Sequence, residues 1–507
     1  MGSSAGTILG YAKGSVALGN AFGTAIASPA FKRTRFTNDG LKRNWKSERS
    51  REVVNSFRTK NFRRLGIDAG GAVASEFVFG NLDDWLESLL YSTWQLTTQR
   101  YNATSDTQIT DVAAGTGVFT VLAASAGDPN RWGAFGVGHL VRTEGFTNAG
   151  NNALKRVTAA TSTSFTVSTS GLVNEAAPPQ GAKAKVVGIE APSNGNISGT
   201  TSGLGAGEVY IINGTGIDFS ALGIVPGMWF KCSAWPTAAN NGWFRALNVT
   251  STRIGCDRAP SGVAIDTASG AQVRIWMPDY LRDGTAAIVW FDFERQLPQL
   301  ATPEYHYFIS MMAKSFQLGL TPQAITNCNV GFIGSTGTTG TSRVGGATDV
   351  AADHLSAIPR TGEMFDAANN VARLFLPDNT VLGNTAVTDC QWQIDNNASG
   401  LPAVGNLGAG RILRPAWNPV LSLKRYYDSR ELQAYIEADT IFGAASILTD
   451  PVVSRAFIID YPSCKLLQAP MDDILADGEL AEALTLGAME NTTFGCQVQF
   501  MRLYEYA

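Results

Sequence analysis

The chain has 507 residues, of which 44% are hydrophobic, 10% aromatic and only 16% charged. Disordered chains are rich in charge and poor in aromatic residues, so this composition excludes a largely disordered protein. No run approaches 18 uninterrupted apolar residues, which excludes a membrane-spanning helix, and no basic-then-apolar leader indicates secretion. The net charge of −4 hides an asymmetry, because residues 31–64 carry +9 and the rest of the chain −13.

The first predicted elements surround this basic segment. Residues 35–46 and 70–79 are predicted strands, and 47–64 between them is predicted to be a long exposed loop. Three interpretations stay open: contact with another subunit, a solvated charged face, or binding of nucleic-acid phosphates. Apolar anchors within a charged stretch favour a buried contact, and here these are Trp45, Phe57 and Phe62. The predicted basic inter-subunit patch comprises Lys42, Arg43, Lys46, Arg49, Arg51, Arg58, Lys60, Arg63 and Arg64.

The clearest predicted helix covers 81–94. Asn81 is the expected N-cap, and Asp83 and Asp84 suit the positive end of the helix dipole. The apolar residues follow helical spacing and form one stripe: Leu82, Trp85, Leu86, Leu89 and Leu90. This helix is expected to lie across a sheet as scaffold.

Residues 105–280 consist mainly of Gly, Ser, Thr and Ala with short β-branched runs, and they repeat at an offset of 89. Gly138 matches Gly227, Asn151-Asn152 matches Asn240-Asn241, and Arg156 matches Arg245. A constant offset with matched turn residues predicts two tandem copies of one small all-β module. The expected domains are 1–104 and 281–507 as one body, with inserted modules at 105–190 and 203–280. The Gly/Ser-rich stretch 188–207 is expected to be a linker.

After residue 283 strand-like sequence returns. Strands are predicted at 286–295, 314–320, 324–334, 387–395, 412–424, 453–460 and 494–503, with a mobile loop at 334–346 and a short helix at 429–438. The fold class is therefore mainly β, a β-sandwich or barrel-like body with a flanking helix. An acidic stretch forms the predicted counterpart of the basic patch: Asp472, Asp473, Asp477, Glu479 and Glu482.

No catalytic or cofactor motif stands out. A P-loop, an HExxH pair and a GxGxxG after a strand are absent from the sequence, and its Cys residues lack zinc-site spacing. The three His residues are well separated, and His139 aligns with Met228 of the second copy, which favours a structural role. We therefore expect no enzyme activity, no metal and no cofactor, with the six cysteines as buried free thiols.

The run from FGTAIASPAFKRTRFTNDG to GNLDDWLESLLYSTW resembles the N-terminal part of a family of tail tube proteins of tailed bacteriophages. The pieces IVWFDFERQ, EYHYFISMMAKSFQLGLTPQAITNCNVGFIG and QWQIDNNASGLPAVG resemble its following strands in the same order. The likeness covers roughly 19–94 and 285–507. Shorter members join the Trp-ended helix almost directly to the IVWFDFER-like strand, whereas here about 185 residues intervene.

The resemblance implies a structural virion protein. Six subunits would close a ring, and stacked rings would form the tube through which the genome passes without specific binding. Expected partners are other copies of the chain, a tape-measure protein in the lumen, and terminator and distal tail or baseplate proteins at the ends. The basic patch would face other subunits, and the modules would project outwards. The protein would be assembled in the bacterial cytoplasm and reside in the virion tail.

The alternative is a β-modular virion or cell-surface adhesin that binds host glycans or proteins. The tandem repeat favours it. Exposed Trp235 or Trp243 would provide a platform for a sugar ring, but the residue type favours packing of both in the core. The missing leader and the resemblance of the N-terminal part argue against it.

Overall fold

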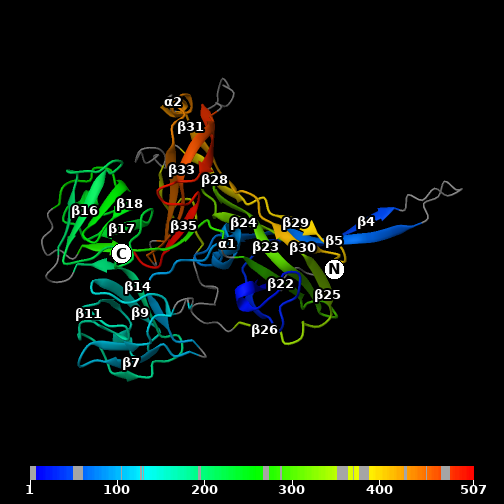
Figure 1. The fold of residues 1–507 in the computed structure, drawn as a ribbon, viewed down its shortest axis with the longest axis horizontal. Coiled ribbons are helices and arrows are strands. Elements are labelled where there is room, and N and C mark those ends of the chain that lie inside the picture. Colours follow the sequence, from blue (N-terminus) through cyan, green and yellow to red (C-terminus); the bar gives the residue numbers. More distant parts are fainter. Residues whose placement is uncertain are drawn as a thin grey trace.

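The computed structural model describes residues 7–49, 61–103, 106–125, 128, 131–191, 196–266, 273–285, 288–350, 364–368, 370–375, 387–427, 431–450, 452, 454–469 and 480–506. This part of the chain is mainly β, as the sequence predicts, with two α-helices, α1 (Asp83–Leu90) and α2 (Glu431–Glu437). In Figure 1 the two modules lie at one end of the molecule, and a long hairpin projects at the other.

Two connected sheets form the body. The first has the order β2–β1–β22–β23–β25, and β2 also pairs with β26. Its strands are β1 (Ile8–Ser15), β2 (Ala30–Arg33), β22 (Val289–Leu297), β23 (Glu304–Leu320), β25 (Thr336–Gly340) and β26 (Thr348–Asp349). The predicted mobile loop at 334–346 is therefore wrong in part, because β25 pairs along Tyr305–Ile309 of β23.

The second sheet has the order β4–β5–β24–β23–β28–β31–β34–β33 and continues through β32 to β27 and through β35 to β21. A short strand, β3, also pairs with β5. The strands are β3 (Asn38–Asp39), β4 (Lys42–Arg49), β5 (Phe62–Glu76), β21 (Asp279–Arg282), β24 (Asn327–Gly334), β27 (Val371–Phe375), β28 (Val387–Asp395), β31 (Asn418–Tyr426), β32 (Phe442–Asp450), β33 (Arg455–Gln468), β34 (Ala481–Met489) and β35 (Gln499–Leu503). A separate hairpin joins β29 (Ser399–Pro402) to β30 (Ala409–Leu413).

The long strand β23 belongs to both sheets, because the chain bends at Ser310. Ser310 has a left-handed backbone conformation with a φ of 54°, which is uncommon for a residue with a side chain. A buried carboxylate fixes the bend: Asp292 accepts hydrogen bonds from the backbone N–H groups of Ser310 at 2.8 Å and Ile26 at 2.7 Å. The apolar core of the body fills the space between the two sheets.

Helix α1 packs on this core. The stripe residues Leu82, Trp85, Leu86, Leu89 and Leu90 are all at most 2% exposed. The predicted cap is wrong: the helix starts after Leu82, and the buried side-chain amide of Asn81 has no hydrogen-bond partner among the described residues. The acidic first turn instead forms ion pairs with other parts of the chain, as described below.

The two modules share one sheet of the order β10–β9–β14–β20–β17–β18–β19–β16–β15, with β6 also paired to β14. Its strands are β6 (Gln99–Tyr101), β9 (His139–Glu144), β10 (Leu154–Arg156), β14 (Lys183–Glu190), β15 (Asn196–Thr200), β16 (Tyr210–Thr215), β17 (Trp229–Ser233), β18 (Trp243–Val249), β19 (Arg253–Arg258) and β20 (Arg274–Trp276). The first module adds a second sheet, β11–β12–β8–β7–β13, made of β7 (Ile109–Ala113), β8 (Val118–Val121), β11 (Ala159–Ala160), β12 (Ser164–Thr166) and β13 (Glu175–Ala176).

Local structure repeats between the modules at the offset seen in the sequence. Short 3-10 helices at 149–151 and 238–240 lie 89 residues apart, and Gly138 and Gly227 both have positive φ. Asn152 bonds the backbone of Phe146 through both side-chain atoms, and Asn241 bonds Trp235 in the same way. The matched Asn residues are therefore turn-forming residues of equivalent loops.

The stretch expected to be a linker is partly strand. Residues 188–190 end β14, and 196–200 form β15, the outer strand of the second module, which pairs with β16. Gly199 of β15 leaves room for the Tyr210 side chain, because a Cβ at this position would lie 1.8 Å from the Tyr210 hydroxyl.

The insertion leaves and rejoins the body at one place. Gln95, just after α1, forms an antiparallel bridge with Tyr280, with N–O distances of 2.8 and 3.0 Å. No helix among the residues described here is long and apolar enough to cross a membrane.

Candidate assembly surface

The hairpin β4–β5 projects from the body (Figure 1). Its outer part, 42–49 paired with 62–70, extends beyond strand β24, which pairs with β5 only from residue 69 onwards. The predicted loop at 47–64 is thus wrong where it is described: 47–49 and 62–64 are strand. We call residues 42–49 and 62–68 the arm. A lone two-stranded ribbon is marginally stable in water, so the arm requires additional contacts.

Strand register divides the arm into two faces. Cross-strand partners lie on the same face of a pair, and the pairs Arg43–Ala69, Trp45–Ile67, Ser47–Arg64 and Arg49–Phe62 define the first face. The pairs Asn44–Asp68, Lys46–Gly66 and Glu48–Arg63 define the second. The register shifts between Lys46 and Ser47, which leaves Leu65 as the extra residue of a bulge.

The first face combines aromatic rings with guanidinium groups. Trp45 is 43% exposed and Phe62 67%. The guanidinium groups of Arg64 and Arg43 lie over the Trp45 ring, at 4.7 and 5.6 Å from its centroid. Arg and aromatic residues are enriched at the centres of protein interfaces, while Lys, Glu and Asp are depleted there. The first face therefore has the composition of a protein-contact surface.

The second face has the composition of a solvated surface. Lys46 pairs with Asp68 at 2.7 Å, and both side chains are more than half exposed. Exposed pairs of this kind contribute at most about 1 kcal/mol. Arg63 lies on this face, directly across from Glu48.

The predicted patch is therefore only partly assembled. Arg43, Arg49 and Arg64 lie on the first face, and Lys42, Lys46 and Arg63 on the second. Arg51, Arg58 and Lys60, together with Phe57, lie outside the described residues. Other cations of the segment are used within the chain: Lys32 pairs with Asp84 and Arg33 with Asp349.

The predicted acidic counterpart needs one correction. Glu482 is fully buried and pairs with Arg425, its direct cross-strand neighbour between β34 and β31. It is therefore not available to a neighbouring copy. Asp472, Asp473, Asp477 and Glu479 lie outside the described residues.

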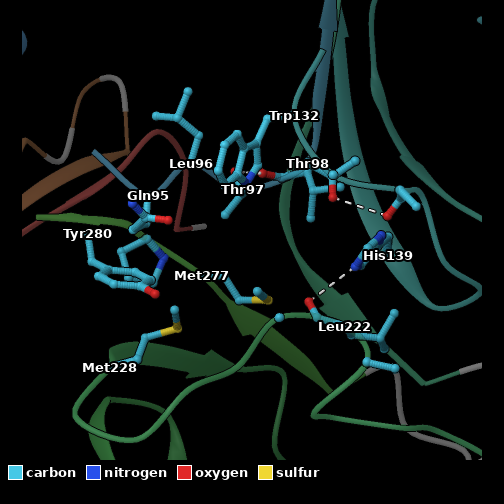
Figure 2. A pocket seen from close by; sticks show the side chains of 16 residues that line it. Gln95, Leu96, Thr97, Thr98, Trp132, His139, Leu222, Met228, Met277 and Tyr280 are labelled. Carbon is cyan, nitrogen blue, oxygen red and sulfur yellow. Dashed lines mark hydrogen bonds between the residues drawn. The ribbon is translucent and has the colours of Figure 1, made fainter. Parts of the chain in front are cut away.

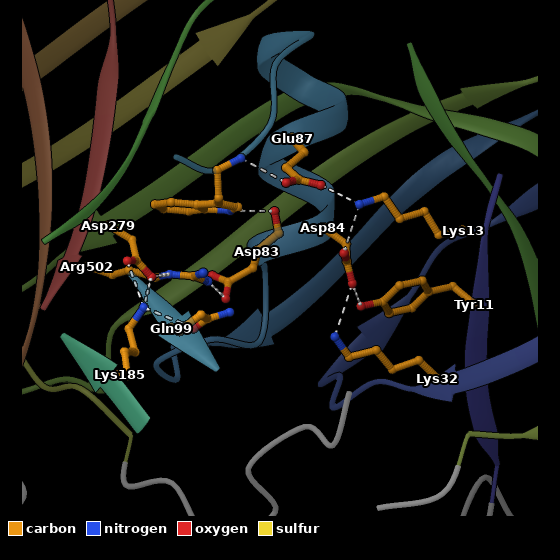
Figure 3. Close-up of polar contacts among 11 residues, drawn as sticks. Tyr11, Lys13, Lys32, Asp83, Asp84, Glu87, Gln99, Lys185, Asp279 and Arg502 are labelled. Carbon is orange, nitrogen blue, oxygen red and sulfur yellow. Dashed lines mark hydrogen bonds and ion pairs between the residues drawn. The ribbon is translucent and has the colours of Figure 1, made fainter. Parts of the chain in front are cut away.

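The first turn of α1 binds strands β1 and β2 through a hydrogen bond and ion pairs. Asp84 accepts from the Tyr11 hydroxyl at 2.8 Å and pairs with Lys32 at 3.1 Å and Lys13 at 3.4 Å (Figure 3). Burial favours the neutral acid, but the two ammonium groups outweigh it and hold the pKa of Asp84 well below its usual range. Lys13 also contacts Glu87, one turn further along the helix.

On its other side, the same turn connects to the modules (Figure 3). Asp83 pairs with Arg502 of β35, and the Arg502 Nε lies 3.3 Å from Asp279. Asp279 in turn accepts from the Lys185 Nζ of β14 at 2.9 Å. Burial lowers the pKa of both Lys185 and Arg502. These pairs join residues up to 419 positions apart, so the pairing could not be predicted from the spacing of the residues in the sequence.

A buried apolar interface attaches the modules to the body. Leu140, Val187, Trp229, Trp243 and Trp276 of the modules share one buried cluster with β32, β33 and β35. The body contributes Ala445, Ile447, Ala456, Ile458, Met501 and Leu503 to that cluster. Removing residues 105–280 would expose this face. Outward projection of the modules stays a proposal.

Polar contacts reinforce the same interface. The indole Nε1 of Trp229 donates to Asp460 at 2.9 Å, and Arg245 pairs with that carboxylate at 3.2 Å. Trp235 and Trp243 are each 4% exposed, so neither is a surface platform for a sugar.

The cysteine and histidine residues considered in the sequence analysis are placed as follows in the fold. All six cysteines are buried and unpaired. His139 is buried between backbone groups, and His306 lies 3.3 Å from Glu304 on β23. His354 lies outside the described residues.

No known protein family and no curated protein matches this chain.

Proposed function

We propose that this chain is a structural subunit that assembles with copies of itself into stacked rings, six to a ring, which form the tube of a phage tail. The tube would conduct the genome into the host, with the tape-measure protein in its lumen during assembly. The resemblance of residues 19–94 and 285–507 to tail tube proteins suggests this assembly.

The observation that carries the proposal is the first face of the arm. It exposes Trp45 and Phe62 beside Arg64 on a two-stranded ribbon, with which no third strand of the described chain pairs before Ala69. Exposed edges and aromatic groups of this kind favour association unless they are covered. A neighbouring copy would cover them. A channel lined by these cations would bind DNA in a salt-dependent way, so the arm would face subunits and not the lumen.

Size measurement and electron microscopy of the purified full chain test the proposal. We expect rings or hollow filaments, with the smallest species near six times the chain mass of 53.9 kDa. A stable monomer at high concentration would contradict it and favour the adhesin.

Two neighbouring charge reversals sharpen the test. Arg64→Glu places a carboxylate beside Trp45 on the first face, whereas Arg63→Glu makes the same change of charge on the second. We expect Arg64→Glu to weaken assembly at least tenfold more than Arg63→Glu, since loss of an interface Arg commonly costs about 2 kcal/mol or more. Equal effects would mean that net charge, and not the first face, drives association.

A further inference from the structure

A cavity of about 270 Å³ lies where the two modules meet the strands that connect them to the body (Figure 2). The residues just before strand β6 form one wall, and the loops before β9 and β17 form others. The lining residues are Gln95, Leu96, Thr97, Thr98, Trp132, Gly133, Ala134, His139, Val186, Ala221, Leu222, Gly223, Met228, Met277, Pro278 and Tyr280.

Its position follows from the repeat. Residues 132–134 and 221–223 are equivalent at the offset of 89, as are His139 and Met228, and both members of each set line the cavity. The equivalent strands β14 and β20 pair antiparallel at Gly188–Trp276 and Ile189–Ile275. Equivalent strands that pair in this way are related by a local two-fold axis. The cavity therefore lies at the symmetric seam between the copies.

His139 fixes the seam and is not free for a ligand. Its Nδ1 accepts from the Gly136 N–H at 3.0 Å, so its Nε2 is the donor to the Leu222 carbonyl of the second module at 3.2 Å. Burial lowers the pKa of His139 to about 4, so the ring is neutral at physiological pH. The lining then contains no charged side chain. A charged ligand would lose its hydration without a counter-charge, which selects for an uncharged one.

Three polar groups around the cavity remain available. The Trp132 Nε1, the Tyr280 hydroxyl and the Gln95 Oε1 have no hydrogen-bond partner within the described part of the chain. Figure 2 shows Met277 with Tyr280 and Met228 on one side of it and His139 and Leu222 on the other. The lining thus combines half-buried aromatic rings, which carry a polar group at one end, with two thioethers.

We propose that this seam cavity binds an uncharged saccharide unit. Trp132 and Tyr280 would pack against the apolar face of the sugar ring. The Trp132 Nε1, the Tyr280 hydroxyl and the Gln95 Oε1 would form hydrogen bonds with the sugar hydroxyls. The volume is just below the ~300–1,000 Å³ of sites for drug-sized ligands, which suits a single sugar ring. This inference goes beyond the proposed assembly and does not depend on it.

Saturation-transfer NMR on the full chain tests the site with glucose, galactose and N-acetylglucosamine, each at about 5 mM, above the ~1 mM dissociation constants of weak ligands. We expect transfer to the ring protons of at least one sugar and little to glucuronate, which is charged. Trp132→Ala should weaken binding at least tenfold. Tyr280→Phe should weaken it about three- to tenfold, as for the loss of one hydrogen bond.

Trp45→Ala is the matched control, because Trp45 is also partly exposed but lies on the arm. It should leave saccharide binding unchanged. Absence of transfer from all three sugars, or binding that Trp132→Ala does not weaken, would overturn the inference. Equal binding of cyclohexanol would also overturn it, since that ligand lacks the ring of hydroxyls. Tubes that form normally but bind no sugar would leave the proposed function standing.

Discussion

Replacing Asp279 with Ala should strongly destabilise the protein, because this carboxylate holds the junction between α1, the modules and β35. Its Oδ1 accepts from the Lys185 Nζ at 2.9 Å and from the Thr97 N–H at 2.7 Å, and its Oδ2 lies 3.3 Å from the Arg502 Nε. Asp279 is 1% exposed, Lys185 3% and Arg502 7%. The substitution would leave two buried cations without this partner.

The expected magnitude follows from that geometry. Breaking a buried ion pair by removing one partner costs about 3–5 kcal/mol, and the unbonded Thr97 N–H adds about 1–3 kcal/mol. Since Arg502 keeps Asp83, we expect a loss of about 4 kcal/mol in the free energy of unfolding at pH 7. Urea denaturation followed by tryptophan fluorescence measures it, with an unchanged m value as a check on the native state.

The pH dependence identifies the mechanism. The folded-state pKa of Lys185 is already below its usual value. At a pH between the folded-state and the unfolded-state pKa, the native state therefore binds fewer protons than the unfolded chain, and stability rises with pH. Without Asp279 this pKa falls further. The destabilisation should therefore shrink as the pH rises above 7 and Lys185 becomes neutral.

Two further variants serve as controls. Asp279→Asn keeps an acceptor for Thr97 but no charge, so its difference from Asp279→Ala measures the hydrogen bond. Adding Lys185→Met to Asp279→Ala removes one stranded cation and should recover stability at pH 7. A loss below about 1 kcal/mol for Asp279→Ala, or one independent of pH, would refute this account of the junction.

The remaining predictions concern single side chains. Burial lowers the pKa of His139 to about 4, so His139 makes stability fall by about 3 kcal/mol as pH drops from 6.5 to 4. His139→Phe should remove this pH dependence. Urea titrations in which the variant shows the same fall would refute the role of His139. Asp292 acts in the opposite sense, because burial raises its pKa to about 6 and stability falls as pH rises from 4 to 6. In the same titration, Asp292→Asn should therefore lose more stability on acidification than the wild type does. Leu89→Ala should cost about 2–5 kcal/mol because Leu89 is 1% exposed, whereas Leu65→Ala, at 54% exposed, should cost under about 1 kcal/mol by thermal melting.

Much of the fold could be predicted because its signals are local. The apolar stripe at 82–90 marks α1, the run at 289–297 marks β22, and residues 387–395 alternate between the two faces of β28. The two modules could be predicted because loops held by side chains such as Asn152 and Asn241 require the same residue in each copy.

The arm could not be predicted as a hairpin, because both of its faces are exposed and the alternation of polar and apolar residues is lost. The edge strands β15 and β25 were hidden by their Gly, Ser and Thr content. The candidate sites were missed for another reason. The faces of the arm depend on a bulge at Leu65, and the seam cavity combines residues from five separate stretches of chain, so both depend on three-dimensional placement.

The insertion also determines the order in which the chain can fold during synthesis. The body draws strands from both sides of the insertion, and β21 pairs with β35 across 217 or more positions, so the body cannot close until β35 emerges from the ribosome. The modules are contiguous and can fold much earlier. Until β35 arrives, however, Trp229 and its neighbours would face solvent, and the nascent chain would present an adhesive surface. Chaperone binding in that interval would protect the chain from aggregation before its body exists.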